Sequence, residues 1–106
     1  MVLTGFLSAD EKKELSEFSG AILDNPKLAL RAERNTIYSS ISENLRASKL
    51  EVIYLVKRFY KKEERFPEAV EIEQQSLKMI NNSSPAVAAA GKSLYWFSSL
   101  KRLSTK

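Results

Sequence analysis

The side chains that most often carry out catalysis or bind transition metals are missing from this sequence, which contains no Cys and no His. Their absence excludes disulfides, thiolate nucleophiles, Ser-His triads and Cys- or His-type zinc sites. Carboxylates do occur in pairs along the chain, namely Glu14/Glu17, Glu63/Glu64 and Glu68/Glu71. Such pairs can share a proton or bind a hard cation, but on Lys-rich helices they are usually solvated charges. We therefore expect no catalytic residue, no metal site and no cofactor.

Residues 57–62 interleave cations with aromatic rings, which is a pattern that can serve nucleic-acid binding. Its candidate phosphate ligands are Lys57, Arg58, Lys61 and Lys62. The rings between them can stack on bases. The alternative is that the rings anchor a core while the cations solubilise the end of a buried helix and complement its dipole. The net charge of +4 is basic but moderate, so it favours anionic partners without selecting nucleic acid.

The last apolar segment places large side chains on more than one side of a single helix. Leu94 and Phe97 point one way, whereas Trp96 and Leu103 point about 100–200° from them. One neighbouring layer cannot easily bury both sides, so we predict that some of Tyr95, Trp96 and Leu103 are exposed. Exposed Trp and Tyr are typical anchors of protein interfaces. A basic aromatic helix can also lie on an anionic membrane or mediate a homodimer, and Trp96 as a core residue is the remaining alternative.

Capping residues and prolines divide the chain into helices. Ser8 and Glu11 form a capping-box pattern that starts the first helix, which should stop just before Pro26. Pro26 can open a second helix. Ser48 and Glu51 form a second capping-box pattern, which predicts a break near residues 47–48. The alternative is one long bent helix over residues 26–60. The second helix would bury an apolar stripe consisting of Leu30, Ile37, Ile41 and Leu45.

Residues 50–60 are the most apolar part of the chain, and they predict a central buried helix. Their β-branched side chains make a strand the competing assignment. A helix is favoured because the Lys- and Glu-rich continuation contains strong helix formers and no turn signal before Pro67. Pro67 then opens a fourth helix, and the pair Ser84-Pro85 opens the last one.

A chain of 106 residues is short for more than one core. We therefore predict a single all-α domain over residues 1–106, a small antiparallel bundle of four to five helices, with frayed ends at about 1–7 and 104–106. No apolar run approaches the ~20 residues that span a bilayer, and the N-terminal residues do not resemble a secretory signal. These features favour a cytoplasmic protein.

The whole chain is similar to the immunity proteins of pediocin-like bacteriocins. The similar stretches are residues 24–26 (Asp-Asn-Pro), the apolar residues 50–56, residues 65–67 (Arg-Phe-Pro) and the aromatic, basic residues 91–103. The resemblance implies a small basic cytosolic bundle without catalytic activity. Such a protein protects its producer by recognising a bacteriocin-loaded sugar-transport receptor at the inner membrane face. The resemblance also implies that recognition lies in the last helix, around Tyr95, Trp96, Lys101 and Arg102.

Three functional hypotheses follow from the sequence. The preferred one is a non-enzymatic protein-binding module whose partner contacts the last helix, at Tyr95, Trp96, Lys101, Arg102 and Leu103, with the immunity role as its most specific form. The first alternative is a small nucleic-acid-associated protein that uses residues 57–62. The second is a structural bundle that dimerises.

Overall fold

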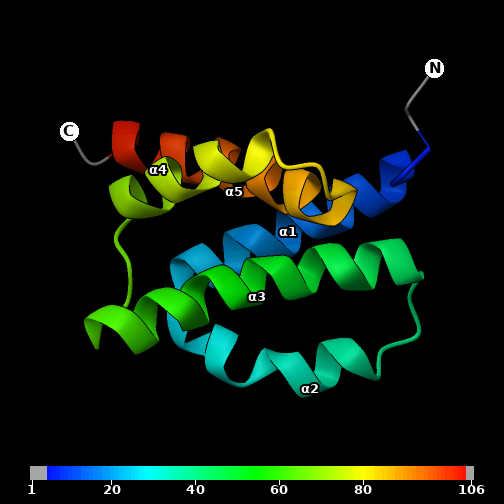
Figure 1. The fold of residues 1–106 in the computed structure, drawn as a ribbon, viewed down its shortest axis with the longest axis horizontal. Helices are drawn as coiled ribbons and strands as arrows, with labels where there is room; N and C mark the ends of the chain where they lie inside the picture. The colour runs from blue at the N-terminus through cyan, green and yellow to red at the C-terminus, as the bar shows by residue number, and fades with distance from the viewer. Residues whose placement is uncertain (1–4, 105–106) are drawn as a thin grey trace.

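The computed structural model describes residues 5–104, and this part of the chain is entirely helical apart from its connections. The elements are α1 (Ala9–Asp24), the short 3-10 helix η1 (Pro26–Leu30), α2 (Ala32–Ile37), α3 (Glu43–Glu63), α4 (Ala69–Ile80) and α5 (Pro85–Ser104). Consecutive helices alternate in direction, so that α1, α3 and α5 run the same way (Figure 1). The predicted all-α antiparallel bundle is therefore confirmed.

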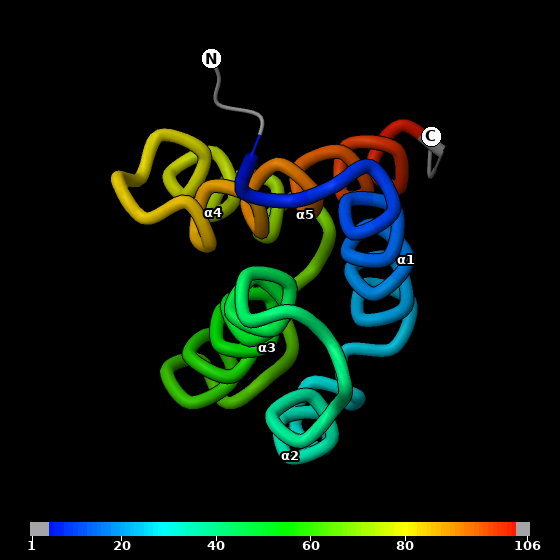
Figure 2. The backbone as a smooth tube through the Cα atoms, turned by 90° about the vertical axis from the view of Figure 1, so that its right-hand side faces the viewer, coloured from blue at the N-terminus to red at the C-terminus, as the bar shows by residue number. Residues whose placement is uncertain are grey.

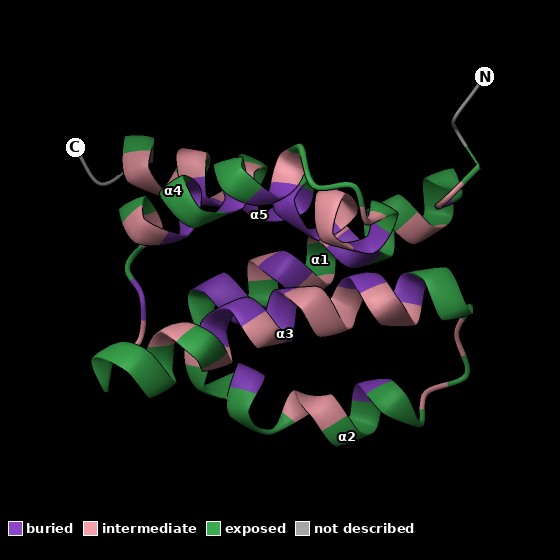
Figure 3. Cartoon of the chain, in the orientation of Figure 1, coloured by how far each residue is buried: buried purple, intermediate pink, exposed green. Residues whose placement is uncertain are grey.

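Helix α5 lies between α4 and α1, and α3 packs beneath α1 and α5 (Figure 2). The η1–α2 segment covers the opposite side of α3 (Figures 1 and 2). Buried residues face the space between these helices (Figure 3). Val52, Ile53 and Val56 on α3 are fully buried, which agrees with the prediction that residues 50–60 form the central helix and not a strand.

Several helix starts form as their caps predict. Ser8 Oγ accepts the Glu11 backbone N–H at 3.1 Å, and the Glu11 carboxylate accepts the Ser8 backbone N–H at 2.8 Å. Helix α1 ends at Asp24, two residues before Pro26, and α5 begins at Pro85. Each of these boundaries is set by a few neighbouring residues, because a cap hydrogen bond or a proline ring acts locally.

The predicted break near residues 47–48 is wrong, because the interruption lies at residues 38–42, between α2 and α3. Ser42 caps α3, and its Oγ accepts the Leu45 backbone N–H at 3.2 Å. Ser48 lies inside α3, where it is fully buried and its Oγ donates to the Asn44 carbonyl at 2.9 Å. A serine hydroxyl on a buried helix face can be satisfied by the carbonyl one turn earlier, so the cap pattern alone does not make a cap.

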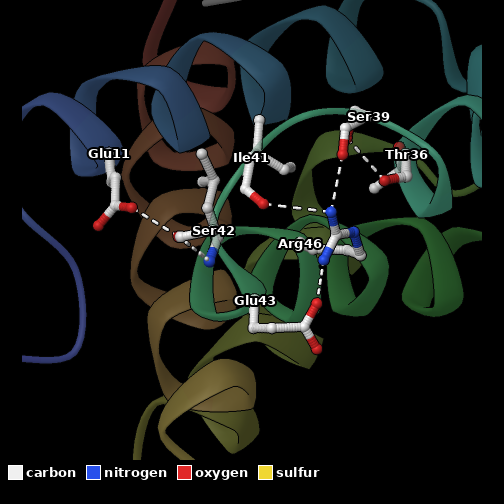
Figure 4. Close-up of polar contacts among 8 residues, drawn as sticks. Glu11, Thr36, Ser39, Ile41, Ser42, Glu43 and Arg46 are labelled. Carbon is white, nitrogen blue, oxygen red and sulfur yellow. Dashed lines mark hydrogen bonds and ion pairs between the residues drawn. The ribbon is translucent and has the colours of Figure 1, made fainter.

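Arg46 fixes the connection before α3. Its guanidinium donates to the Ser39 carbonyl at 2.7 Å and to the Ile41 carbonyl at 3.1 Å, and it pairs with Glu43 (Figure 4). On the other side of the connection, Ser42 Oγ donates to the Glu11 carboxylate of α1 at 2.6 Å (Figure 4). These contacts position the start of α3 between α1 and α2.

Half of the apolar stripe predicted for the second helix is packed inward, because Leu45 is buried and Ile41 packs against the core, although they lie in α3 and in the connection before it. Leu30 is 43 % exposed and Ile37 is 40 % exposed, whereas Ala29 and Thr36 are buried. The physical reason is the 3-10 geometry of η1 and the interruption at Arg31. Both change the angle between successive side chains, so residues that would share one face of a continuous α-helix no longer do so.

The predicted frayed ends differ in part from the structure. Leu7 is only 4 % exposed, and the Asn44 side-chain amide donates to the Phe6 carbonyl at 2.9 Å, so the chain is packed from residue 6 onward. Helix α5 extends to Ser104. Residues 1–4 and 105–106 lie outside the described residues. No helix within the described part combines the length and the apolar character needed to cross a membrane.

Candidate interaction site on the last helix

Small residues on one face of α5 allow it to pack closely against α4. Ala90 is fully buried, and a Cβ atom added at Gly91 would lie 2.7 Å from Met79 Cβ and 3.0 Å from the Ser76 carbonyl oxygen. Only a glycine permits so close an approach of two helix backbones. This face of α5 is therefore covered by α4.

The outer face of α5 has the opposite character. Trp96 is 62 % exposed, Leu103 is 55 % exposed and Leu100 is 46 % exposed. Together with Lys92 they form a row at intervals of four, four and three residues, which places them on one side of the helix. The prediction that part of this segment is exposed is confirmed, and Trp96 is not a core residue. Its role in binding remains a prediction.

Next to this row lies a groove of about 430 Å³ between α1, α5 and the residues that precede α1, which we call the α1–α5 groove. Its lining residues are Phe6, Leu7, Lys12, Leu15, Ser16, Pro85, Ala88, Ala89, Lys92, Ser93 and Trp96. Leu7 and Leu15 are buried, whereas Lys12 and Lys92 are exposed. The groove thus combines an apolar base with two cations, and its lining contains no carboxylate.

A polar contact inside the core holds the two helices of this groove together. Ser93 Oγ on α5 donates to Ser19 Oγ on α1 at 2.8 Å and lies 3.4 Å from the Leu15 carbonyl. Ser19 and Ser93 are both buried. Because a buried hydroxyl without a partner is costly, this pair favours one fixed spacing between α1 and α5.

A second hollow of about 340 Å³ follows between the same two helices, nearer their C-terminal ends. Gly20, Phe97 and Leu100 contribute to it. Lys101 forms an ion pair with Asp24 at 2.9 Å at this place. Leu100 therefore connects the second hollow with the exposed row of α5.

The other residues predicted to bind a partner are engaged within the chain. Arg102 Nε donates to the Glu73 carboxylate of α4 at 2.7 Å, and Ser99 Oγ donates to the same carboxylate at 2.8 Å. Both hydrogen bonds lower the pKa of Glu73, and the one between Arg102 and Glu73 raises the pKa of Arg102. Lys101 and Arg102 therefore tie α5 to α1 and α4, and Tyr95 is partly buried. Of the five predicted residues, Trp96 and Leu103 are the ones that the structure leaves most exposed.

The predicted nucleic-acid patch is also divided by the fold. Lys57 donates to the Glu33 carboxylate of α2 at 2.6 Å, and this hydrogen bond lowers the pKa of Glu33. Arg58, Lys61 and Lys62 are exposed near the end of α3. The two rings of the run are not presented for stacking as a pair. Phe59 is partly buried beneath the Arg65 guanidinium, and Tyr60 contacts the Phe66 ring at 4.6 Å between centroids.

Sequence reasoning did not identify Lys12, Ser16 or Lys92 as parts of a site. Lys12 and Lys92 lie on helices that are far apart in the sequence, and only the packing of α1 against α5 places them on one groove. The one available signal was that Lys92 precedes Trp96 by a single helical turn. Within residues 5–104, the structure gathers no group of three carboxylates that could hold a metal ion.

The fold and the groove define a helical bundle with an outward, partly apolar face on α5. No known family model matches the chain, and no curated protein or solved structure is significantly similar to it. Function is therefore argued from the geometry and chemistry of the site.

Proposed function

We propose that this chain is a non-enzymatic protein-binding module that contacts its partner through the outer face of α5. The observation that carries the proposal is the 62 % exposure of Trp96 on a helix whose opposite face is fully packed. Tryptophan is the residue type most enriched among those that dominate binding energies at protein interfaces. Leu100 and Leu103 extend the exposed row, so that water can be excluded around the indole ring on docking.

A bacteriocin-immunity role is the most specific form of this proposal. The similarity of residues 24–26, 50–56 and 65–67 to that family supports it, as does the aromatic and basic character of the last helix. In this form the chain acts in the cytoplasm on a bacteriocin-loaded receptor at the membrane. The test is expression of the chain in a bacteriocin-sensitive strain, where it should protect the cells and the Trp96→Ala variant should not. If the chain protects against none of the bacteriocins tested, the immunity role is contradicted, but the broader protein-binding proposal is not.

The broader proposal is tested by affinity capture with matched variants. Wild-type chain, Trp96→Ala and Tyr38→Ala serve as baits in the same native lysate. Tyr38 is 81 % exposed and lies at the end of α2, on the other side of α3, so its truncation removes a more exposed ring elsewhere. We expect a protein that is retained by the wild type and by Tyr38→Ala and lost with Trp96→Ala. Identical captures by all three baits would contradict the proposal.

A nucleic-acid role is the main alternative, and the exposure of Arg58, Lys61 and Lys62 favours it. It requires retention on heparin that falls steeply with salt and is lost in the Lys61→Glu/Lys62→Glu variant. A structural dimer formed through α5 is the other alternative. It requires a molecular mass and a melting temperature that rise with protein concentration.

A further inference from the structure

The α1–α5 groove selects the charge of what can occupy it. Lys12 projects from α1 and Lys92 from α5, and the part of the chain that the structure describes offers neither of them an ion-pair partner. The lining has no carboxylate. On α1, Glu11 and Glu14 are bound to Ser42 and Lys49 of α3, and Asp24 is paired with Lys101 of α5 beyond the groove. An occupant that brings negative charge would therefore meet two cations without an ion-pair partner among the described residues and no carboxylate in the groove lining.

The apolar surface is longer than the groove itself. From Pro85 at one end of the groove to Leu103 at the end of the exposed row, α5 advances by 18 residues, which is about 27 Å of helix. The row continues with Trp96, Leu100 and Leu103 beyond the last lysine. A small anionic amphiphile would cover only the groove. An amphipathic helix that lies along α5 would cover the groove and the row together, with apolar residues at intervals of three and four.

We propose that the α1–α5 groove and the exposed row of α5 receive an acidic amphipathic helix of the partner protein. The apolar side of that helix packs on Trp96 and on the apolar base of the groove. Its carboxylates pair with Lys12 and Lys92. This inference rests on the proposed function and adds the secondary structure and the charge of the partner segment.

The probe for this inference is a synthetic 18-residue helical peptide of Leu and Glu that contains no tryptophan. Trp96 is the single tryptophan of the chain and lines the groove, so its fluorescence reports directly on occupancy. We expect a blue shift of the emission on addition of the peptide, because the indole ring leaves water. A peptide of the same pattern with Lys in place of Glu should bind about tenfold more weakly or not at all.

Charge-reversal variants test the role of the two lysines. In Lys12→Glu/Lys92→Glu, the affinity for the Leu/Glu peptide should fall about tenfold, because two attractions become repulsions. The matched control is Lys13→Glu/Lys78→Glu, which changes the net charge by the same amount at exposed positions outside the groove and should bind like the wild type. Binding of the Leu/Glu peptide to the wild type should also weaken between 0.1 M and 1 M salt, because the Debye screening length falls from about 10 Å to about 3 Å.

The outcomes separate this inference from the proposed function. Equal binding of the Lys and Glu peptides, no binding of either, or full binding by Lys12→Glu/Lys92→Glu would overturn the acidic helix as occupant. In any of these cases, the affinity capture can still show a protein that the wild type retains and Trp96→Ala does not. That result would mean that α5 binds a partner segment that is not an acidic helix. If Trp96→Ala also captures everything that the wild type does, both proposals fail. A blue shift that appears on concentrating the protein without peptide would identify a second copy of the chain as the occupant.

Discussion

The close approach of α4 and α5 makes Gly91→Ala a destabilising substitution, although Ala is normally the better helix former. The new Cβ would lie 2.7 Å from Met79 Cβ and 3.0 Å from the Ser76 carbonyl oxygen and the Ile80 backbone nitrogen. Two of these three atoms belong to the backbone of α4 and cannot rotate away. Overpacking costs about 1–3 kcal/mol, and contact with backbone atoms places this case in the upper part of that range, at about 2–3 kcal/mol. The gain in helix propensity is about 1 kcal/mol. We expect a net loss of about 1–2 kcal/mol in the free energy of unfolding, measured by urea denaturation followed by circular dichroism.

Gly20→Ala is the matched control, because Gly20 also lies inside a helix. Its added Cβ would meet only the Phe97 ring, at 3.5–3.7 Å, which is ordinary van der Waals contact. Here the lower entropy of the unfolded chain should dominate and raise the free energy of unfolding by about 0.5–1 kcal/mol. The two substitutions should therefore move the melting temperature in opposite directions, by about 5 °C for each kcal/mol. A Gly91→Ala protein as stable as the wild type would refute the close packing of α4 on α5.

Four other substitutions test separate parts of the structure. Ser42→Ala should lower the free energy of unfolding by about 1–2 kcal/mol in urea titrations, because it removes the cap of α3. Ser48→Ala should change it by less than about 0.5 kcal/mol, because its hydroxyl bonds only within its own helix. Hydrogen bonds from Arg65 and from the Glu68 backbone N–H lower the pKa of Glu71 from 4.5 to about 2, so ionised Glu71 stabilises the folded chain above pH 4.5. This contribution is lost as the pH falls towards 2, and thermal melts of Glu71→Gln and wild type should converge there. Trp96→Ala should lower the free energy of unfolding by at most about 2 kcal/mol, because only the smaller part of the residue is buried, and a loss of ~3 kcal/mol or more would place Trp96 in the core.

The sequence predicted several helix boundaries that depend on a few neighbouring residues. The fourth helix begins at Ala69, after the Glu68–Glu71 capping box, and not at Pro67 as expected, and the start of α3 was missed because a distant residue decides it. Ser8 with Glu11 and the pair Ser84-Pro85 act locally, and both helices start as predicted. Ser42 has no carboxylate three residues later, whereas Ser48 has one, so the local pattern favoured the wrong serine. What distinguishes Ser42 is its hydrogen bond to Glu11 on α1, a contact that exists only once the bundle has formed.

The candidate site shows the same division. Helical periodicity predicted that some of Tyr95, Trp96 and Leu103 are exposed, because one neighbouring layer cannot cover two opposite sides of a helix. It left open whether Trp96 is a core residue, and the structure exposes Trp96 and Leu103. The sequence did not predict the pairing of Arg102 with Glu73, because Glu73 is a charged residue that α5 covers only in the folded chain. The cation Lys12 likewise joins Lys92 only through the packing of α1 on α5. Sequence periodicity thus identifies an exposed side chain, and tertiary packing decides which charges surround it.

The exposure of Trp96 is itself a consequence of how α5 packs. Because Gly91 and Ala90 bring α4 close, large side chains of α5 are accommodated away from that contact, and none of the helices in the described residues covers the outer row. A tryptophan side chain that is 62 % exposed leaves on the order of 130 Å² to be covered on docking, worth about 3 kcal/mol. That is the size of a dominant contact at a protein interface. Binding of a partner to α5 should therefore weaken roughly a hundredfold in Trp96→Ala, and a change of less than threefold would show that the partner binds elsewhere.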